Sequence, residues 1–303
     1  MANENLHKAN KAKNDEFYTQ LSDIEKELSH YKEQFKNKVV LCNCDDPRVS
    51  NFFHYFSYNF ESLGLKRLIA TCYKNQDAEL FSTHKSDKAI YLEYTGDKNG
   101  NRVPDPEEIG IKHLNGDGDF RSSECIKLLE QADIVVTNPP FSLFREYVAQ
   151  LVEYDKRFLI LGNDNCRTYK EVFKLIKENK LWCGYNHVKE FKKPDGSIQK
   201  FGNVSWYTNL DVANRHEDLI LYKTYNPQEY PKYDNYDAIN VDKTADIPMD
   251  YAEIMGVPIT FLDKYNPEQF EIIGNEYDLE IEKGRGYVKG KRLYSRIFIK
   301  NKK

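Results

Sequence analysis

Residues 133–141 read Asp-Ile-Val-Val-Thr-Asn-Pro-Pro-Phe (DIVVTNPPF), and this stretch decides the fold that the sequence predicts. Its apolar run at 133–137 indicates a short buried strand, and the two prolines end that strand because proline cannot donate to a sheet ladder. A helix should follow, with Ser142 as its N-cap and apolar residues at helical spacing on one face. A strand that runs through a polar loop into a helix is typical of α/β sheets, whose ligands bind at the carboxyl ends of the strands.

The same alternation of strands and helices extends on both sides of this stretch. Short strands are predicted at 38–42, 68–72, 89–95 and 158–161, with an Asn-Gly turn signal at 99–100 after the third of them. Amphipathic helices are predicted around 22–35, 52–63 and 168–176. This pattern predicts an α/β fold with a mostly parallel sheet covered on both faces. We expect one domain at 1–180 and a smaller, loop-rich region at 181–303, whose late strands complete the core.

Composition narrows the class of protein. The chain has 303 residues, of which 40% are hydrophobic and 30% charged, as in soluble globular proteins. No apolar run approaches the roughly 20 residues that span a bilayer. The six cysteines include no CxxC pair, so reduced thiols, a cytoplasmic location and no metal ion are expected. Nine Lys or Arg stand against two Glu in residues 280–303, although the whole chain has a net charge of −4. This basic end predicts a phosphate-binding surface, with a solvated tail as the alternative.

The loop after the strand at 133–137 has the residue types that can prepare an exocyclic amine for methylation. It consists of Asn138, Pro139, Pro140 and Phe141. The lone pair of such a nitrogen is delocalised into the ring, so acceptors placed against its N–H bonds make it more nucleophilic. The side-chain oxygen of Asn138 and the backbone carbonyl of Pro139 can be these acceptors, and the prolines keep them stiff. Phe141 offers a flat face for a base flipped out of a duplex. The sequence therefore favours transfer of a methyl group to the N6 of adenine.

A cofactor pocket is expected at neighbouring strand ends. Asn43, Asp45 and Asp46 follow the first strand, and Asp119 and Phe120 follow a glycine-containing turn at 116–118. An Asp can accept from the adenine amino group of a cofactor, and a Phe can pack on its ring. Such turns are common, so each motif alone is weak.

The chain resembles the adenine-N6 DNA methyltransferases of type II restriction–modification systems, specifically the EcoRI methyltransferase family. The resemblance runs through nearly the whole chain. It rests on NDEFYTQ (14–20), VVLCNCDDPRVSNFF (39–53), GDGDFRSSE (116–124), DIVVTNPPFSLFREY (133–147), TYKEVF (168–173), WYTNLDV (206–212), YPKYDNYDAINV (230–241) and MGVPITFL (255–262).

The resemblance implies a Rossmann-like domain that binds S-adenosylmethionine, followed by a target-recognition region. Phe17, Tyr18 and Thr19 would touch the methionine end of the cofactor. Asn43, Asp45, Asp46 and Asn138 would line its pocket, Asp119 and Phe120 would hold its adenine, and residues 138–141 would hold the target base. The implied partners are duplex DNA, with GAATTC or a relative as the site, and a cognate endonuclease, with the enzyme acting as a monomer. Candidate DNA contacts are Trp206, Tyr207, Arg285, Lys291 and Arg292.

The chain also departs from related methyltransferases. The Phe-x-Gly-x-Gly loop is absent after the first strand, the second strand ends Thr71-Cys72-Tyr73 without a ribose-binding acid, and the stretch 184–204 is short. Because Asn-Pro-Pro-aromatic also occurs in methyltransferases of other substrates, three alternatives stay open: an RNA adenine-N6 methyltransferase, a methyltransferase of protein glutamine, and an inactive nucleic-acid-binding paralogue. The missing glycine-rich loop argues against the first two, and the intact residues 138–141 argue against the third.

Overall fold

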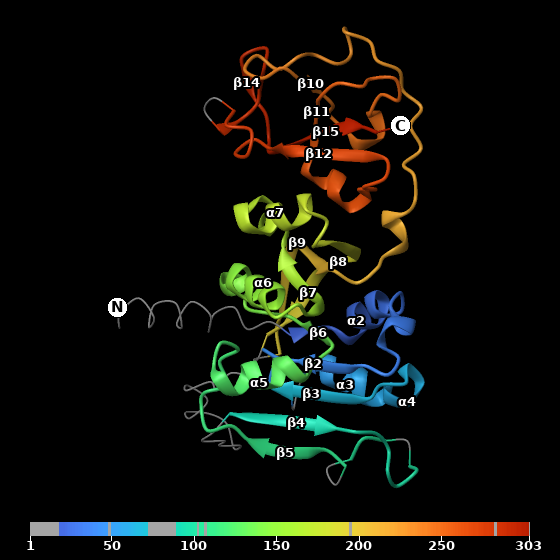
Figure 1. Ribbon diagram of the computed structural model, residues 1–303, viewed down its shortest axis with the longest axis vertical. Coiled ribbons are helices and arrows are strands. Elements are labelled where there is room, and N and C mark those ends of the chain that lie inside the picture. Colours follow the sequence, from blue (N-terminus) through green and yellow to red (C-terminus); the bar gives the residue numbers. More distant parts are fainter. Residues whose placement is uncertain are drawn as a thin grey trace, which may run out of the picture. The chain divides into compact units, whose positions relative to one another are not determined.

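The computed structural model describes residues 18–47, 50–71, 89–101, 103–105, 108–193, 196–281 and 284–302 (Figure 1). Phe17, Cys72 and Tyr73, which the sequence analysis singled out, lie outside these residues. The chain divides into two compact units. The first comprises Met1–Cys166 and Asn186–Leu210, and the second comprises Arg167–Tyr185 and Asp211–Lys303.

A nine-stranded sheet contains the strands of the first unit, in the order β1-β8-β9-β7-β6-β2-β3-β4-β5. These strands are β1 (Tyr18–Thr19), β2 (Val39–Cys42), β3 (Arg67–Thr71), β4 (Ile90–Tyr94), β5 (Gly110–His113), β6 (Ile134–Thr137), β7 (Arg157–Asn163), β8 (Trp182–Lys192) and β9 (Ile198–Thr208). The five strands predicted before residue 162 are all present, within two residues of their expected bounds.

The sheet is parallel only at its centre. β2 pairs in parallel with β3 and β6, and β6 with β7. Around these four strands the pairing is antiparallel, between β3 and β4, β4 and β5, β7 and β9, and β1 and β8. A short connection explains the antiparallel pairing of β4 with β5, because a parallel pair needs a longer crossover, but β7 and β9 are separated by β8 and β1 is far from β8 in the chain. The fold is thus a mixed α/β fold with one large sheet, rather than the mostly parallel sheet that the sequence analysis expected.

The helices of the first unit pack their apolar faces into the core. They are α2 (Leu21–Leu28), α3 (Asn51–Tyr58), α4 (Phe60–Leu63), α5 (Ser123–Gln131) and α6 (Phe144–Glu153). The predicted Ser142 cap is wrong: a 3-10 turn, Phe141–Leu143, precedes α6, whose N-cap Leu143 makes no side-chain capping bond. Ser122 does cap a helix, because its hydroxyl accepts from the Cys125 N–H at the start of α5.

β8 and β9 are eleven residues each, longer than the short strands expected after residue 181. Their alternation is hard to read in the sequence because β9 is buried on both faces over its second half, from Val204 to Thr208. There β9 pairs with β7, with Tyr207 opposite Ile160. The part of the chain after residue 181 therefore contributes two strands to the large sheet, next to its parallel centre.

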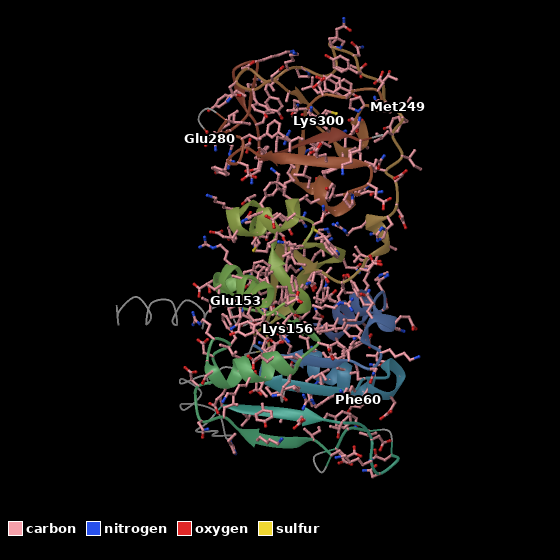
Figure 2. All side chains as sticks on the ribbon, viewed as in Figure 1. Phe60, Glu153, Lys156, Met249, Glu280 and Lys300 are labelled. Carbon is pink, nitrogen blue, oxygen red and sulfur yellow. The ribbon has the colours of Figure 1, made fainter. Side chains whose placement is uncertain are left out.

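The second unit contains α7 (Lys170–Lys177) and a four-stranded sheet in the order β10-β11-β15-β12. These strands are β10 (Ile239–Asn240), β11 (Met255–Pro258), β12 (Phe270–Asn275) and β15 (Arg296–Asn301), and β13 (Tyr287–Val288) and β14 (Lys291–Arg292) form a separate hairpin. Tyr233 packs so closely on Gly256 and Gly286 that a Cβ at either glycine would lie within 2.5 Å of its ring or hydroxyl. Side chains fill the space between the elements of this unit, and Lys300 is labelled on β15 (Figure 2). Within the described residues, no helix is long and apolar enough to span a membrane.

Candidate active site

The loop after β6 lies at the carboxyl end of a central strand. β6 pairs with β2 on one side and β7 on the other, so residues 138–141 leave the middle of the sheet. Asn138 is buried, with 7% of its surface exposed, and Phe141 is half-buried. The prolines between them remove two backbone donors and restrict the backbone, so the residue types of this polar loop themselves make it stiff.

The loop after β2 is held by hydrogen bonds from other elements. The Thr137 hydroxyl on β6 donates to the backbone carbonyl of Asn43, and the Tyr147 hydroxyl on α6 donates to its side-chain oxygen. Asn43 and Asp45 are both more than nine-tenths buried. Cys44, between them, has a φ of 86°, in the left-handed region that favours glycine. This residue therefore adopts a glycine-like conformation in the loop where the expected glycines are absent.

Tyr147 joins two of the predicted cofactor segments. Its hydroxyl reaches Asn43, and its ring meets the ring of Phe120 edge-on, with centroids 5.1 Å apart. Burial raises the pKa of Tyr147 well above its ordinary value, so the hydroxyl stays protonated and remains a donor. Tyr147 was not singled out in the sequence. A hydroxyl on a fully buried face could have signalled a partner, because buried polar groups are generally hydrogen-bonded.

Asp119 follows Gly118, which has a φ of 78°. Both carboxylate oxygens of Asp119 accept from Arg121, at 2.9 Å from Nε and 2.6 Å from Nη2. Although partial burial acts in the opposite direction, the hydrogen bonds and charge of Arg121 hold the pKa of Asp119 below its ordinary value. Oδ1 also accepts from the backbone N–H of Arg121 at 2.8 Å, whereas Oδ2 keeps a second lone pair with which Asp119 can accept from a ligand amine.

Tyr18 and Thr19 reach the sheet as the short edge strand β1. Thr19 pairs with Phe191 of β8, and its carbonyl accepts from the Asn51 side chain at 2.7 Å, which connects β1 to the start of α3. Thr19 is 1% exposed, and its hydroxyl oxygen has no hydrogen-bond partner among the described residues. A buried hydroxyl of this kind fits a polar ligand, since an unsatisfied buried group costs free energy.

Two aromatic rings pack against Phe141. Its ring meets Phe191 of β8 at 6.2 Å and Phe201 of β9 at 6.1 Å, both edge-on, and those two rings are 5.5 Å apart. Phe191 and Phe201 were not singled out in the sequence. The patchy alternation of residues 182–208 hid the hairpin that brings them to the Asn-Pro-Pro-Phe loop.

Trp206 and Tyr207 correct the sequence analysis, which offered them as DNA contacts. Both are 0% exposed on β9, where Trp206 packs on Phe52 and Tyr207 on Phe144. A side chain with no exposed surface in the core cannot reach a duplex.

The other candidate DNA contacts lie in the second unit. Lys291 and Arg292 are exposed on β14, whereas Arg285 is partly buried and pairs with Glu276 at 2.8 Å. The backbone of the β13–β14 turn is fixed by Asp234, whose carboxylate accepts from the N–H groups of Lys289 and Gly290. The β13–β14 hairpin therefore presents three exposed cations, Lys289, Lys291 and Arg292, on a fixed backbone. Among the described residues, no group of three or more His, Cys, Asp or Glu side chains is arranged to hold a metal ion.

Comparisons with known proteins identify the family of this chain. The family described as "Adenine-specific methyltransferase EcoRI" matches residues 5–302. The chain is 53% identical to the Type II methyltransferase M.EcoRI of Escherichia coli, with 99% of this chain and 97% of that protein covered. It is 40% identical to the Type II methyltransferase M.MpnI of Mycoplasma pneumoniae and 39% identical to M.MgeORF184P of Mycoplasma genitalium, each over at least 97% of both chains. No solved structure matches. The chain belongs to the EcoRI family of adenine-specific methyltransferases.

Proposed function

We propose that this enzyme transfers a methyl group from S-adenosylmethionine to the N6 of adenine in duplex DNA, and that it flips the base out of the helix to do so. The observation that carries the proposal is the connection of the candidate segments. Thr137 and Tyr147 join the loop after β2 to β6 and α6, and Tyr147 also contacts Phe120. The strand order β3-β2-β6-β7-β9, with β9 antiparallel, supports a Rossmann-like methyltransferase domain.

Residues of three loops fit the cofactor. Thr19 offers a buried hydroxyl without a partner among the described residues, and Asp119 keeps acceptor capacity beside the ring of Phe120. We assign Tyr18 and Thr19 to its methionine end, Asp119 and Phe120 to its adenine, and Asn43, Asp45 and Asp46 to the wall between. When bound, S-adenosylmethionine supplies an electrophilic methyl group on its sulfonium.

Asn138 and Pro139 activate the target amine in this proposal. The Asn138 side-chain oxygen and the Pro139 carbonyl accept from the two N–H bonds, which draws the nitrogen toward tetrahedral geometry. Because both acceptors are preorganised, little reorganisation is needed as positive charge develops on nitrogen. No strong base is needed, since the amine loses its proton readily once it is cationic. Phe141 stacks on the base, and Phe191 and Phe201 hold its ring from the edges.

We assign DNA recognition to the second unit and the basic hairpin β13–β14. Lys291 and Arg292 would contact phosphates, so replacing both with Gln should flatten the log–log salt dependence of binding by about one unit per lost contact. Since M.EcoRI and the two Mycoplasma proteins are named Type II methyltransferases, we propose a site-specific enzyme that acts as a monomer beside a cognate endonuclease. GAATTC, methylated on the second adenine, is the proposed site.

The test measures transfer of labelled methyl from S-adenosylmethionine to duplex DNA, RNA and protein in parallel. The proposal expects incorporation into the duplex alone, recovered as N6-methyladenine after digestion. The product is then challenged with the nuclease that cuts GAATTC. Protection supports the site, and full cleavage despite incorporation would keep the chemistry but reject the site. Preferred labelling of RNA would overturn the assignment to duplex DNA.

A further inference from the structure

The connection between β4 and β5 has no part in the proposed methyl transfer, yet its sequence is specific. Residues 97–108 read DKNGNRVPDPEE. The calcium loop of EF-hand proteins has the pattern D-x-[DN]-x-[DN]-G-x5-E, with oxygen ligands at its positions 1, 3, 5, 9 and 12. Asp97, Asn99, Asn101, Asp105 and Glu108 occupy these five positions. We propose that this loop is a calcium-binding site.

One position departs from the pattern. The loop has Arg102 where the EF-hand has its turn-forming glycine at position 6. Its glycine is instead Gly100, at position 4, which has a φ of 80° and nothing within 4 Å of where a Cβ would stand. The left-handed turn is therefore placed earlier in the loop, which changes the backbone path but keeps the spacing of the oxygen-bearing side chains.

Glu108 supplies the observation that points to a ligand. Only 6% of this residue is exposed. Its Oε1 accepts from the backbone N–H groups of Lys98 at 2.6 Å and Asn99 at 3.1 Å, so the carboxylate faces the start of the loop. Its Oε2 is buried and has no hydrogen-bond partner among the described residues. Burying a charged oxygen without a partner is costly, and a hard cation at this position would remove that cost.

The other side chains of the pattern converge on Asp105. The Nδ2 of Asn99 donates to Asp105 Oδ2 at 2.6 Å, and that of Asn101 at 3.3 Å. These two amide N–H groups supply positive partial charge to a carboxylate that a cation would otherwise neutralise. The oxygens of the two amides accept from the backbone N–H groups of Asn101 at 2.9 Å and Val103 at 2.8 Å, and each keeps a second lone pair for a cation. Among the described residues, no group of three or more His, Cys, Asp or Glu side chains is arranged to hold a metal ion, so calcium binding requires the carboxylates of the loop to move closer together.

The surroundings of the loop are negatively charged. Glu61 of α4 accepts from the Asp97 N–H at 3.2 Å and adds a further carboxylate. Burial and the charges of Glu108, Asp97, Glu61 and Asp105 raise the pKa of Tyr94, at the end of β4, to about 12. Tyr94 also packs edge-on against Phe60, with centroids 5.1 Å apart, so the base of the loop rests on the core. A divalent cation bound in the loop would reduce the repulsion between these neighbouring carboxylates.

The ligand set indicates calcium with modest affinity. Calcium accepts six to eight oxygens in flexible geometry, whereas magnesium requires a near-octahedral site. Two of the five pattern positions are neutral amides. Calcium binds more weakly when fewer of its ligands are charged, so we expect a Kd of about 10⁻⁴–10⁻³ M. The expected consequence is a β4–β5 hairpin that is more stable with calcium than without it.

The test is calorimetric titration of the full chain with calcium chloride after treatment with a chelator. We expect one calcium ion per chain, and magnesium at the same concentration should bind at least tenfold more weakly. Glu108→Gln should weaken calcium binding at least tenfold. Asn101→Ala, which changes an exposed side chain, should weaken it severalfold and remains informative if the Glu108 variant does not fold.

Glu276→Gln is the matched control, because Glu276 is also a buried carboxylate that accepts from a backbone N–H, that of Gly286, but lies in the second unit. Its calcium affinity should equal that of the unaltered chain. Three results would each overturn the proposal: no binding at 10 mM calcium, equal binding of magnesium, or calcium affinity unchanged in both loop variants.

Discussion

The two polar loops at the carboxyl edge of the sheet reach rigidity by different routes. Residues 138–141 are restrained by their own prolines, which limit the backbone whatever surrounds it. Residues 43–47 are restrained by partners, because Thr137 and Tyr147 hold Asn43 from another strand and from a helix. In the second loop Cys44 also adopts a left-handed conformation that costs an ordinary residue about 1–2 kcal/mol.

This difference has a functional consequence. The proposed base-binding loop must place acceptors against a substrate that enters from solvent, and local stiffness protects it from motions elsewhere. The proposed cofactor loop depends on Tyr147, which also packs on Phe120, so the two cofactor segments are coupled. We therefore expect changes at Asn138 and Pro139 to affect chemistry more than stability, whereas changes around residues 43–47 should affect stability and cofactor affinity together.

Asn138→Ala should give the largest effect. Removing one preorganised acceptor should lower kcat about 10²–10³-fold, while cofactor affinity and the free energy of unfolding change little. Single-turnover methylation and calorimetric binding of the cofactor measure the two parts separately. Asn163→Ala is the control, since Asn163 ends the neighbouring strand β7, and it should lose less than tenfold. Near-normal turnover in the Asn138 variant would reject the mechanism.

Tyr147→Phe should give the next largest effect, and on cofactor binding rather than on chemistry. The change leaves the buried Asn43 oxygen without its donor, which should cost about 1–3 kcal/mol of stability. It should also weaken cofactor binding about tenfold. Tyr31→Phe is the control, because Tyr31 is a buried tyrosine whose hydroxyl donates to Glu27 at 2.9 Å, away from the site. The idea fails if both variants lose stability alike and neither changes cofactor affinity.

The contrast between a loop restrained by its own residues and a loop restrained by distant partners also explains which features the sequence could predict. The Asn-Pro-Pro-Phe loop was located by local residues alone, and the strands around it followed from short apolar runs. The antiparallel flanks were not predicted, because β8 and β9 do not alternate cleanly and pairing direction depends on residues far apart. The β8–β9 hairpin brings Phe191 and Phe201 to Phe141, and no local sequence pattern predicts that contact.

The roles of buried residues were also hidden from the sequence. Trp206 and Tyr207 have side chains that suit DNA contacts, and only their register against β7 shows that both point into the core. The left-handed Cys44 was equally unpredictable, since nothing in its residue type favours a positive φ.

Comparing Ala and Gly at Cys44 should isolate the backbone strain of the cofactor loop. Both substitutions remove the thiol, but only glycine relaxes at a φ of 86°. Cys44→Gly should therefore be more stable than Cys44→Ala by about 1 kcal/mol. The same pair at Cys42, in the regular strand β2, should show the opposite order, with glycine less stable by about 0.5–1 kcal/mol. Denaturant unfolding of the four variants measures both differences in stability. If Gly and Ala rank in the same order at Cys44 and at Cys42, backbone strain at Cys44 does not account for the result.

The smallest expected effect concerns the third loop at this edge, which is held by charge and should respond to acid. The Arg121 ion pair lowers the pKa of Asp119 below its ordinary value of 3.8, so its stabilising contribution is complete above that value and is lost as pH falls through the lowered pKa. Because the pair is partly exposed, with 23% and 48% of the two side chains accessible, Asp119→Asn should cost at most about 1 kcal/mol near neutral pH. The difference in unfolding free energy between the unaltered chain and this variant should be constant from about pH 5 to 7 and shrink below about pH 4.

Glu146→Gln, which removes the more exposed partner of Arg121, should produce a smaller difference across the same range. A gap between the chain and Asp119→Asn that stays constant down to pH 3 would mean that charge does not hold this loop.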